Sequence, residues 1–266
     1  MNAGMSAVRY TRTGSGAPLV LLHGIGMSRR AWDPVIPLLA RHFDVIAVDL
    51  PGFGESRLPG DGRCDAGSLA TAVGELLDEL GVDEPFLAGN SLGGWVALEL
   101  AAQRPVSGMT LLSPAGVWRE WSPRYCRISL RAARWMSRRL ARPLSVMVRW
   151  RLGRIALLGQ THGRPWRLTA DDARRVMRDM GSCPGFDANF AATTRTRYDA
   201  SEPLGCPTTV AFGSRDWLLR PRHARHVERL TPGYRAADLP GCGHVPMSDD
   251  PAAVAALIIE MAPVRV

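Results

Sequence analysis

Residues 85–95 read Pro-Phe-Leu-Ala-Gly-Asn-Ser-Leu-Gly-Gly-Trp, and this stretch decides the fold of the chain. A short apolar run typical of a strand ends at a Gly-x-Ser-x-Gly turn, and a helical pattern begins at Leu92. A serine in so sharp a turn has a strained backbone, and the flanking glycines avoid clashes that Cβ atoms would cause. The turn would raise the Ser91 hydroxyl above the sheet edge, beside the positive end of the next helix. The stretch therefore predicts that Ser91 is a nucleophile.

Strands and helices alternate on both sides of this turn. The sequence predicts further strands at residues 8–11, 18–23, 45–49, 109–112, 208–212 and 236–239. Helical patterns lie between them, at residues 32–41, 68–80, 92–103, 222–230 and 251–261. This alternation predicts an α/β fold, a mostly parallel twisted sheet flanked by helices on both faces.

The alternation stops after residue 115 and resumes near residue 204. Between these points no buried strand is predicted, and helical patterns occupy residues 124–141 and 170–180. We therefore expect one core domain made of residues 1–115 and 204–266, with residues 116–203 inserted into it as a helical lid. A chain of 266 residues is long enough for one large domain of this kind.

Two more residues are expected to join Ser91, because ligands of open α/β sheets bind at the carboxyl ends of the strands. His244 lies in a glycine-rich loop after the strand at 236–239, and Asp216 follows the strand at 208–212. A serine hydroxyl needs a base to take its proton, and the base needs a carboxylate to fix its tautomer. The sequence predicts the catalytic triad Ser91, Asp216 and His244.

The oxyanion formed during acyl transfer needs two N–H donors. Leu92, the residue after the nucleophile, supplies one backbone N–H. Ile25, in the loop His23-Gly24-Ile25-Gly26 after the strand at 18–23, is expected to supply the other. For His23 itself we expect a structural role, in which the ring binds nearby backbone and holds this loop.

These motifs together resemble the α/β-hydrolase fold family, in its serine hydrolase branch. The matching segments are residues 23–26, 49–56, 89–94, 213–216 and 243–244. The resemblance implies a hydrolase whose insertion is the variable cap of the family. The Gly-Asn-Ser-x-Gly-Gly stretch is similar to esterases and to hydrolases that cleave carbon–carbon bonds in ring-fission products.

Two positions distinguish the chain from branches of this family. The epoxide hydrolase and haloalkane dehalogenase branches use a carboxylate nucleophile, whereas position 91 is serine. The carbon–carbon hydrolases usually carry tryptophan after the catalytic histidine, whereas this chain has Val245. The resemblance thus favours an ester, lactone or thioester as substrate, with two alternatives left open: carbon–carbon cleavage of dienoates and a triad-bearing small-molecule binding protein.

The predicted lid carries the positive charge of the chain. All 33 basic residues are arginine, and residues 118–200 hold 18 of them against six acidic residues. Three interpretations stay open: a solvated arginine face with the apolar face packed over the pocket, an anionic substrate, or attachment to an anionic membrane. The residues expected to contact substrate are Trp135, Met136, Arg195, Arg197 and Val245.

Other classes of partner are not indicated. The five cysteines lack metal-site spacing, and no glycine-rich nucleotide loop occurs, so we expect neither a metal nor a cofactor. No apolar run is long enough to span a membrane, and the first residues lack a signal peptide, so a cytoplasmic protein is expected. No nucleic-acid partner is predicted, and a homodimer is left open.

Overall fold

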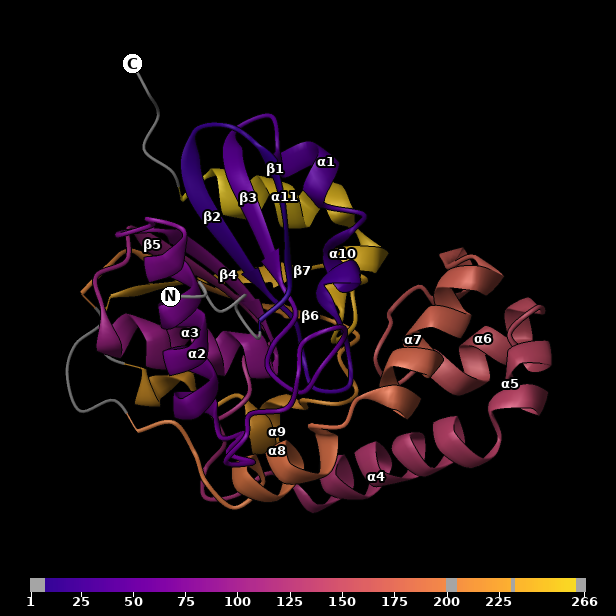
Figure 1. The fold of residues 1–266 in the computed structure, drawn as a ribbon. Helices are drawn as coiled ribbons and strands as arrows, with labels where there is room; N and C mark the ends of the chain where they lie inside the picture. Colours follow the sequence, from indigo (N-terminus) through magenta and orange to yellow (C-terminus); the bar gives the residue numbers. More distant parts are fainter. Residues whose placement is uncertain (1–7, 200–204, 231–232, 262–266) are drawn as a thin grey trace, which may run out of the picture.

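The structure is a computed structural model that describes residues 8–199, 205–230 and 233–261. Within these residues, seven strands form one sheet in the order β1-β3-β2-β4-β5-β6-β7 (Figure 1). The strands are β1 (Tyr10–Gly14), β2 (Ala17–Leu22), β3 (Phe43–Val48), β4 (Phe86–Asn90), β5 (Gly108–Leu112), β6 (Thr208–Gly213) and β7 (Tyr234–Leu239). β1 is antiparallel to β3, and every other neighbouring pair is parallel. The predicted mostly parallel sheet is confirmed.

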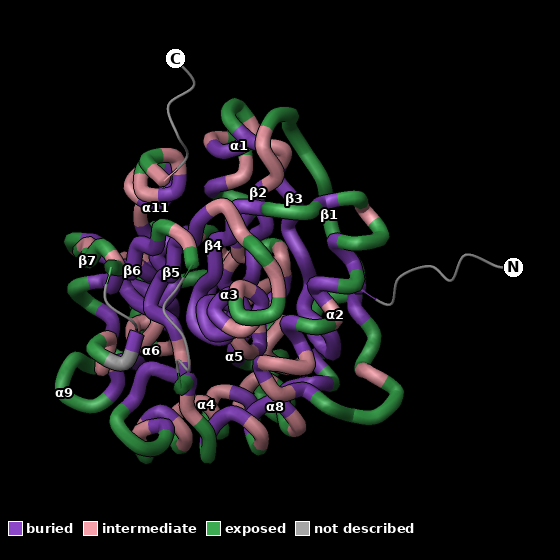
Figure 2. The backbone as a smooth tube through the Cα atoms, turned by 90° about the vertical axis from the view of Figure 1, so that its left-hand side faces the viewer, coloured by how far each residue is buried: buried purple, intermediate pink, exposed green. Residues whose placement is uncertain are grey.

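Helices cover both faces of the sheet because successive strand residues point to opposite faces. Val20 and Leu22 belong to the core packed under α2 (Ala66–Glu79) and α3 (Leu92–Gln103). Leu19 and Leu21 belong to the opposite core. That core packs under α1 (Ile36–Leu39), α10 (Pro246–Asp249) and α11 (Pro251–Ile259). Figure 2 shows the central strands buried between these layers, whereas the edge strand β1 is exposed.

Two predicted helices are broken. In place of one helix over 32–41 the chain forms a single 3-10 turn, η1 (Arg29–Trp32), and the short α1. Pro34 and Pro37 explain the break, because proline lacks the N–H that a continuous helix needs. In place of a helix over 222–230 the structure has α9 (Pro221–Ala224) and a 3-10 turn, η3 (Val227–Arg229).

Five helices follow β5 in the sequence and precede β6: α4 (Arg124–Arg139), α5 (Ala141–Met147), α6 (Arg151–Leu158), α7 (Ala170–Ser182) and α8 (Phe186–Thr193). We call them the helical insert. They lie together beside the sheet (Figure 1) and α5, α6 and α7 share a small apolar core that includes Leu144, Val148 and Met177. The predicted boundary between residues 203 and 204 lies outside the described residues. None of the described helices is long and apolar enough to cross a membrane.

Helix α4 does not follow the interpretation of a solvated arginine face with an apolar face packed inward. Ile128 and Trp135 are 60% and 58% exposed, whereas Arg134 is buried. The Arg134 guanidinium donates hydrogen bonds to the carbonyl oxygens of Met180 and Cys183. It also lies 5.2 Å from the centroid of the Phe186 ring. Arginine is buried here because backbone carbonyls and an aromatic face replace its water.

A buried carboxylate joins the insert to the core. Asp249, at the end of α10 and 2% exposed, accepts backbone hydrogen bonds from Gly163 and Arg164, each at 2.7 Å. It accepts a third, also at 2.7 Å, from Gly243, the residue before His244. The Asp249 side chain therefore holds the segment between α6 and α7 against the loop that carries the predicted catalytic histidine.

We expect Asp249→Ala to lower the free energy of unfolding by about 3 kcal/mol or more, because it leaves three buried N–H donors without an acceptor. Urea unfolding of both proteins gives this difference. The matched control is Asp171→Ala, whose carboxylate is 86% exposed and pairs with Arg174 on the surface; there a loss of less than about 0.5 kcal/mol is expected. Equal losses in the two variants would contradict the role given to Asp249.

Candidate active site

The turn between β4 and α3 has the strained geometry that the sequence predicts. Ser91 has φ 55° and ψ −114°, a conformation that residues with a side chain rarely adopt. Its N–H donates to the carbonyl of Leu112 at 3.0 Å, and its own carbonyl accepts from Ala115 at 2.9 Å. A Cβ atom on Gly93 would lie 2.2 Å from the carbonyl oxygen of Leu22 on β2. Glycine is therefore required where α3 crosses the sheet.

Asp216 and His244 are brought together from the ends of β6 and β7. The Oδ2 atom of Asp216 lies 3.0 Å from Nδ1 of His244, and both residues are 4% exposed. Oδ1 of Asp216 accepts backbone hydrogen bonds from Leu218 at 2.9 Å and Leu219 at 2.7 Å. Burial alone would raise the pKa of Asp216, but His244 and the Leu219 amide outweigh it and hold the pKa below its usual value. An ionised Asp216 keeps the ring proton on Nδ1, which leaves Nε2 of His244 as a base.

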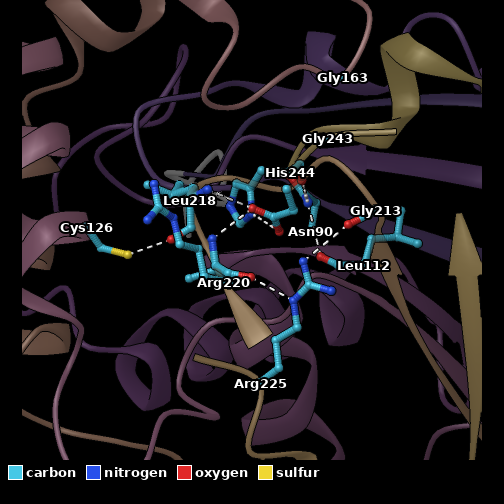
Figure 3. Close-up of polar contacts among 12 residues, drawn as sticks. Asn90, Leu112, Cys126, Gly163, Gly213, Leu218, Arg220, Arg225, Gly243 and His244 are labelled. Atoms are coloured by element: carbon cyan, nitrogen blue, oxygen red, sulfur yellow. Dashed lines mark hydrogen bonds and ion pairs between the residues drawn. The ribbon is translucent and has the colours of Figure 1, made fainter. Parts of the chain in front are cut away.

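Asn90 links this pair to the serine turn. Its side-chain amide donates to the carbonyl of His244 at 2.8 Å and to the carbonyl of Leu112 at 3.0 Å. Figure 3 shows Asn90 and His244 side by side, with Leu112 below them. Sequence analysis did not identify Asn90, although its position within the Gly-Asn-Ser turn is the signal that could have done so. The Asn90 side chain holds the histidine loop next to the residue that carries the hydroxyl.

The Ser91 hydroxyl and the His244 ring are not hydrogen-bonded to each other in the part of the chain that the structure describes. Hydrogen bonds between a nucleophile and its base are often long or poorly aligned in the absence of substrate. A missing hydrogen bond between these two side chains therefore does not argue against a nucleophile–base pair.

Two N–H groups beside Ser91 are free. Neither the Ile25 nor the Leu92 amide donates to another group within the part of the chain that the structure describes. Both residues line the same cavity as Ser91. Leu92 begins α3, where the first N–H groups of a helix have no acceptor of their own. Two unpaired donors beside a serine can stabilise an oxyanion.

His23 holds the loop that carries Ile25. Leu50 N–H donates to Nε2 of His23 at 3.0 Å, so the ring proton is on Nδ1, which lies 2.8 Å from the carbonyl of Gly24. Complete burial lowers the pKa of His23, so the ring stays neutral and keeps this pattern. These contacts agree with the structural role expected for His23.

Two cavities flank this group of residues. The cavity beside Ser91 has a volume of about 50 Å³ and mainly apolar walls. Its lining includes Ile25, Leu92, Trp118, Leu130, Phe190 and Leu218. A larger cavity of about 390 Å³ lies between η1 and α7 and is lined by Met27 and Val245, among others. Of the predicted triad, Ser91 lines the smaller cavity, and Val245, the residue after His244, lines the larger one.

The predicted substrate contacts are distributed unevenly. Val245 lines the larger cavity, and its N–H donates to the carbonyl of Thr161 at 2.9 Å. Trp135 lies on the outer surface, and Met136 packs against the apolar core of the insert. Arg195 is exposed, and Arg197 donates to the carbonyl of Arg119. The last four are not among the described residues that line either cavity.

Cys126 is the cysteine that lines the Ser91 cavity. Burial raises the pKa of its thiol to about 12, so it stays protonated. The thiol donates to the carbonyl of Leu218 at 2.7 Å, which Figure 3 shows. Cys126 therefore supports the loop after Asp216 and is not a competing nucleophile. Among the described residues, no cluster of three or more histidine, cysteine or acidic side chains is placed to bind a metal ion.

A model of the alpha/beta hydrolase family matches residues 19–257. The chain belongs to this family. It is 29% identical over 255 residues to a pimeloyl-[acyl-carrier protein] methyl ester esterase of Aeromonas hydrophila, which covers 92% of this chain and 95% of the relative. It is 30% identical over 198 residues to an epoxide hydrolase of Mycobacterium tuberculosis, which covers 71% and 91%. The relatives of this alpha/beta hydrolase thus include both esterases and epoxide hydrolases.

A solved structure of the same fold is a thermophilic esterase from Thermogutta terrifontis. The two structures superpose with a TM-score of 0.75 at 24% sequence identity, over 95% of this chain and 92% of the other. At this identity the likeness concerns the fold alone. The reaction is therefore inferred from the residues at the site.

Acid should destabilise this alpha/beta hydrolase through His23 and His162. Burial lowers the pKa of both rings below the usual 6.5. Between 6.5 and the lowered pKa values, the unfolded chain binds protons that the folded chain does not, so the free energy of unfolding decreases as the pH falls through that window. Urea unfolding at several pH values should show a loss of about 1 to 1.5 kcal/mol per pH unit for each ring.

Replacement of each histidine separates its share of this pH dependence. His23→Gln and His162→Gln should each reduce the slope of unfolding free energy against pH, whatever their effect on stability at neutral pH. An unchanged slope in both variants would contradict the assignment of two neutral buried rings.

Proposed function

We propose that this alpha/beta hydrolase is a serine hydrolase that cleaves a carboxylic ester, lactone or thioester through an acyl-enzyme on Ser91. The observation that carries the proposal is the buried Asp216–His244 pair at the sheet edge where Ser91 has its strained backbone. The two unpaired amides of Ile25 and Leu92 beside Ser91 support it. In this proposal Ser91, Asp216 and His244 are catalytic, and the helical insert is a lid over them.

The first half of the reaction forms the acyl-enzyme. Rotation of the Ser91 side chain brings its hydroxyl to Nε2 of His244, which takes the proton as the oxygen attacks the substrate carbonyl. The carbonyl oxygen becomes an oxyanion and accepts hydrogen bonds from the N–H groups of Ile25 and Leu92. Each such hydrogen bond lowers the activation free energy by about 3 kcal/mol. Asp216 stabilises the imidazolium, which then gives its proton to the leaving group as the carbonyl–heteroatom bond breaks.

The second half releases the acid. Water takes the place of the leaving group near His244, loses a proton to Nε2 and attacks the acyl carbon. The oxyanion forms again in the same two-amide site. Collapse of this intermediate breaks the bond to Ser91 Oγ, which takes the proton back from His244. The free enzyme and a carboxylic acid result.

The chemistry of serine favours an acyl substrate over an epoxide. Attack of a hydroxyl on an epoxide would leave Ser91 as an ether, which water with a histidine base does not cleave. An acyl ester of Ser91 keeps an electrophilic carbonyl carbon, so water can release it. The presence of serine at position 91 therefore supports the esterase-like reaction among the activities of the relatives.

We expect Ser91→Ala to abolish turnover of p-nitrophenyl esters and labelling by a fluorophosphonate, because the acyl-enzyme cannot form. Asp216→Asn should reduce kcat by roughly 10⁴-fold while the protein stays folded, because the histidine loses its tautomer. Stopped-flow release of p-nitrophenol and intact-protein mass spectrometry measure both effects. Equal turnover in the wild type and Ser91→Ala would refute the proposal.

The same assay distinguishes the two alternatives. Turnover of ring-fission dienoates with poor ester turnover would assign carbon–carbon cleavage instead. Labelling of Ser91 without turnover of either class, together with tight retention of ligand, would assign a binding protein.

The size of the Ser91 cavity predicts a short acyl group. A cavity of about 50 Å³ with apolar walls holds a few carbon atoms beside the serine. We expect kcat/KM to fall roughly tenfold or more from p-nitrophenyl butyrate to octanoate. Leu130→Ala, which enlarges the cavity, should narrow that ratio. A preference for octanoate in the wild type would contradict the prediction of a short acyl group.

A further inference from the structure

A long part of the helical insert has no acidic side chain. Residues 121–170 contain twelve arginines and neither aspartate nor glutamate. The rest of the chain holds the other 21 arginines and all 25 acidic residues. General use of arginine along the chain therefore does not explain the charge of this segment. The positive charge of this segment is therefore balanced either by an anionic partner or by solvent and its counterions.

The arginines gather in a groove. Arg138 on α4, Arg142 on α5, and Arg174 and Arg178 on α7 line a groove of about 450 Å³, which we call the arginine groove. The lining has no acidic residue but includes Ser137, Ser145 and Ser182. Arg174 pairs with Asp171 at 2.6 Å. The other three arginines have no ion pair among the described residues. The three guanidinium groups that lack such a pair repel one another, and an anion in the groove would relieve that repulsion.

Apolar side chains are exposed next to this groove. Six large apolar residues between positions 135 and 155 are exposed: Trp135, Leu140, Val146, Trp150, Leu152 and Ile155. Leu152, in the first turn of α6, is 79% exposed. Arg149 and Arg151 flank Trp150 and are exposed as well. Helix α5 contributes Ala141, Arg142 and Ser145 to the groove. Figure 1 shows that α5 lies at the outer end of the insert, far from the sheet.

We propose that this end of the insert binds the surface of an anionic lipid bilayer. Headgroup phosphates would occupy the arginine groove, while Trp150, Leu152 and their apolar neighbours enter the interface. Tryptophan, aliphatic side chains and arginine without acidic residues are the combination that favours such surfaces. This interaction goes beyond the proposed hydrolysis and does not depend on the reaction at Ser91.

The composition of the surface favours lipid over other partners. A second copy of the chain would place arginines against arginines, which disfavours a dimer through this face. A nucleic acid or a soluble phosphate would satisfy the arginines but would leave Leu152, Val146 and Ile155 in water. A bilayer with anionic headgroups accepts both kinds of side chain.

The test is sedimentation of the full chain with vesicles of phosphatidylcholine alone or mixed with phosphatidylglycerol. We expect binding to the anionic vesicles, weaker at high salt, and little to the neutral ones. Arg138→Gln combined with Arg142→Gln should weaken binding about 25-fold, since each arginine near such a surface contributes about fivefold. Leu152→Ser should weaken it roughly tenfold through the loss of apolar burial.

Matched variants on the core serve as controls. Arg41→Gln and Leu58→Ser change exposed residues far from the insert in sequence and should bind vesicles as the wild type does. Circular dichroism checks that every variant is folded. Equal binding to both vesicle types, no binding to either, or binding of inorganic phosphate or RNA without vesicle binding would overturn the proposal. So would a concentration-dependent dimer that Leu152→Ser abolishes.

Discussion

The left-handed backbone of Ser91 is the constraint on which the site depends. It lets β4 turn into α3 within one residue, so that the hydroxyl stands at the sheet edge and the Leu92 amide is left without an acceptor. The same turn brings α3 so close to β2 that only hydrogen fits on Gly93. A strained residue of this kind costs about 1 to 3 kcal/mol and persists because its surroundings fix it. Here the carbonyl of Leu112 and the amide of Ala115 do so.

Buried polar side chains then place the loops around that turn. Four of these side chains form hydrogen bonds with backbone groups of the loops: His23, Asn90, Asp216 and Asp249. Some of these backbone groups are distant in sequence, and the others would lack a hydrogen-bond partner without the side chain. A buried polar group without a partner is costly, so each of these contacts allows few alternative loop positions. The result is a set of loops from β2, β4, β6 and β7 that meet at one edge of the sheet. Preorganisation of this kind is what acyl-transfer chemistry requires.

Charge divides the molecule into two parts. The core has balanced charge and contains the predicted triad, whereas the helical insert has an excess of arginine and much of the exposed apolar surface. Some arginines are structural: Arg134 is buried and its guanidinium donates to backbone carbonyl groups. Others, such as Arg138 and Arg142, face a groove that holds no acidic residue. Identical side chains thus have different roles that only their surroundings distinguish.

Local pattern was enough for much of the fold. Buried strands are predicted by the apolar runs at residues 18–23 and 208–212, and a sharp turn is predicted by the glycines that flank Ser91. These features depend on neighbouring residues in the chain, so the sequence alone predicts them. The break in the helix predicted over 32–41 does not follow from the apolar spacing, which continues across Pro34 and Pro37. The pairing of Asp216 with His244 could be expected because parallel strands end at one edge, and their contact at 3.0 Å agrees with it.

The α/β alternation, the strained serine turn and the order in which polar residues follow the strands can all be predicted from the amino-acid sequence. These depend on short-range periodicity and on backbone sterics. Only the tertiary structure decided that Arg134 is buried while Trp135 is exposed, that Asn90 and Asp249 hold the histidine loop, and that four arginines share one groove. Such features depend on which partners lie across space, and spacing along the chain carries no information about those partners.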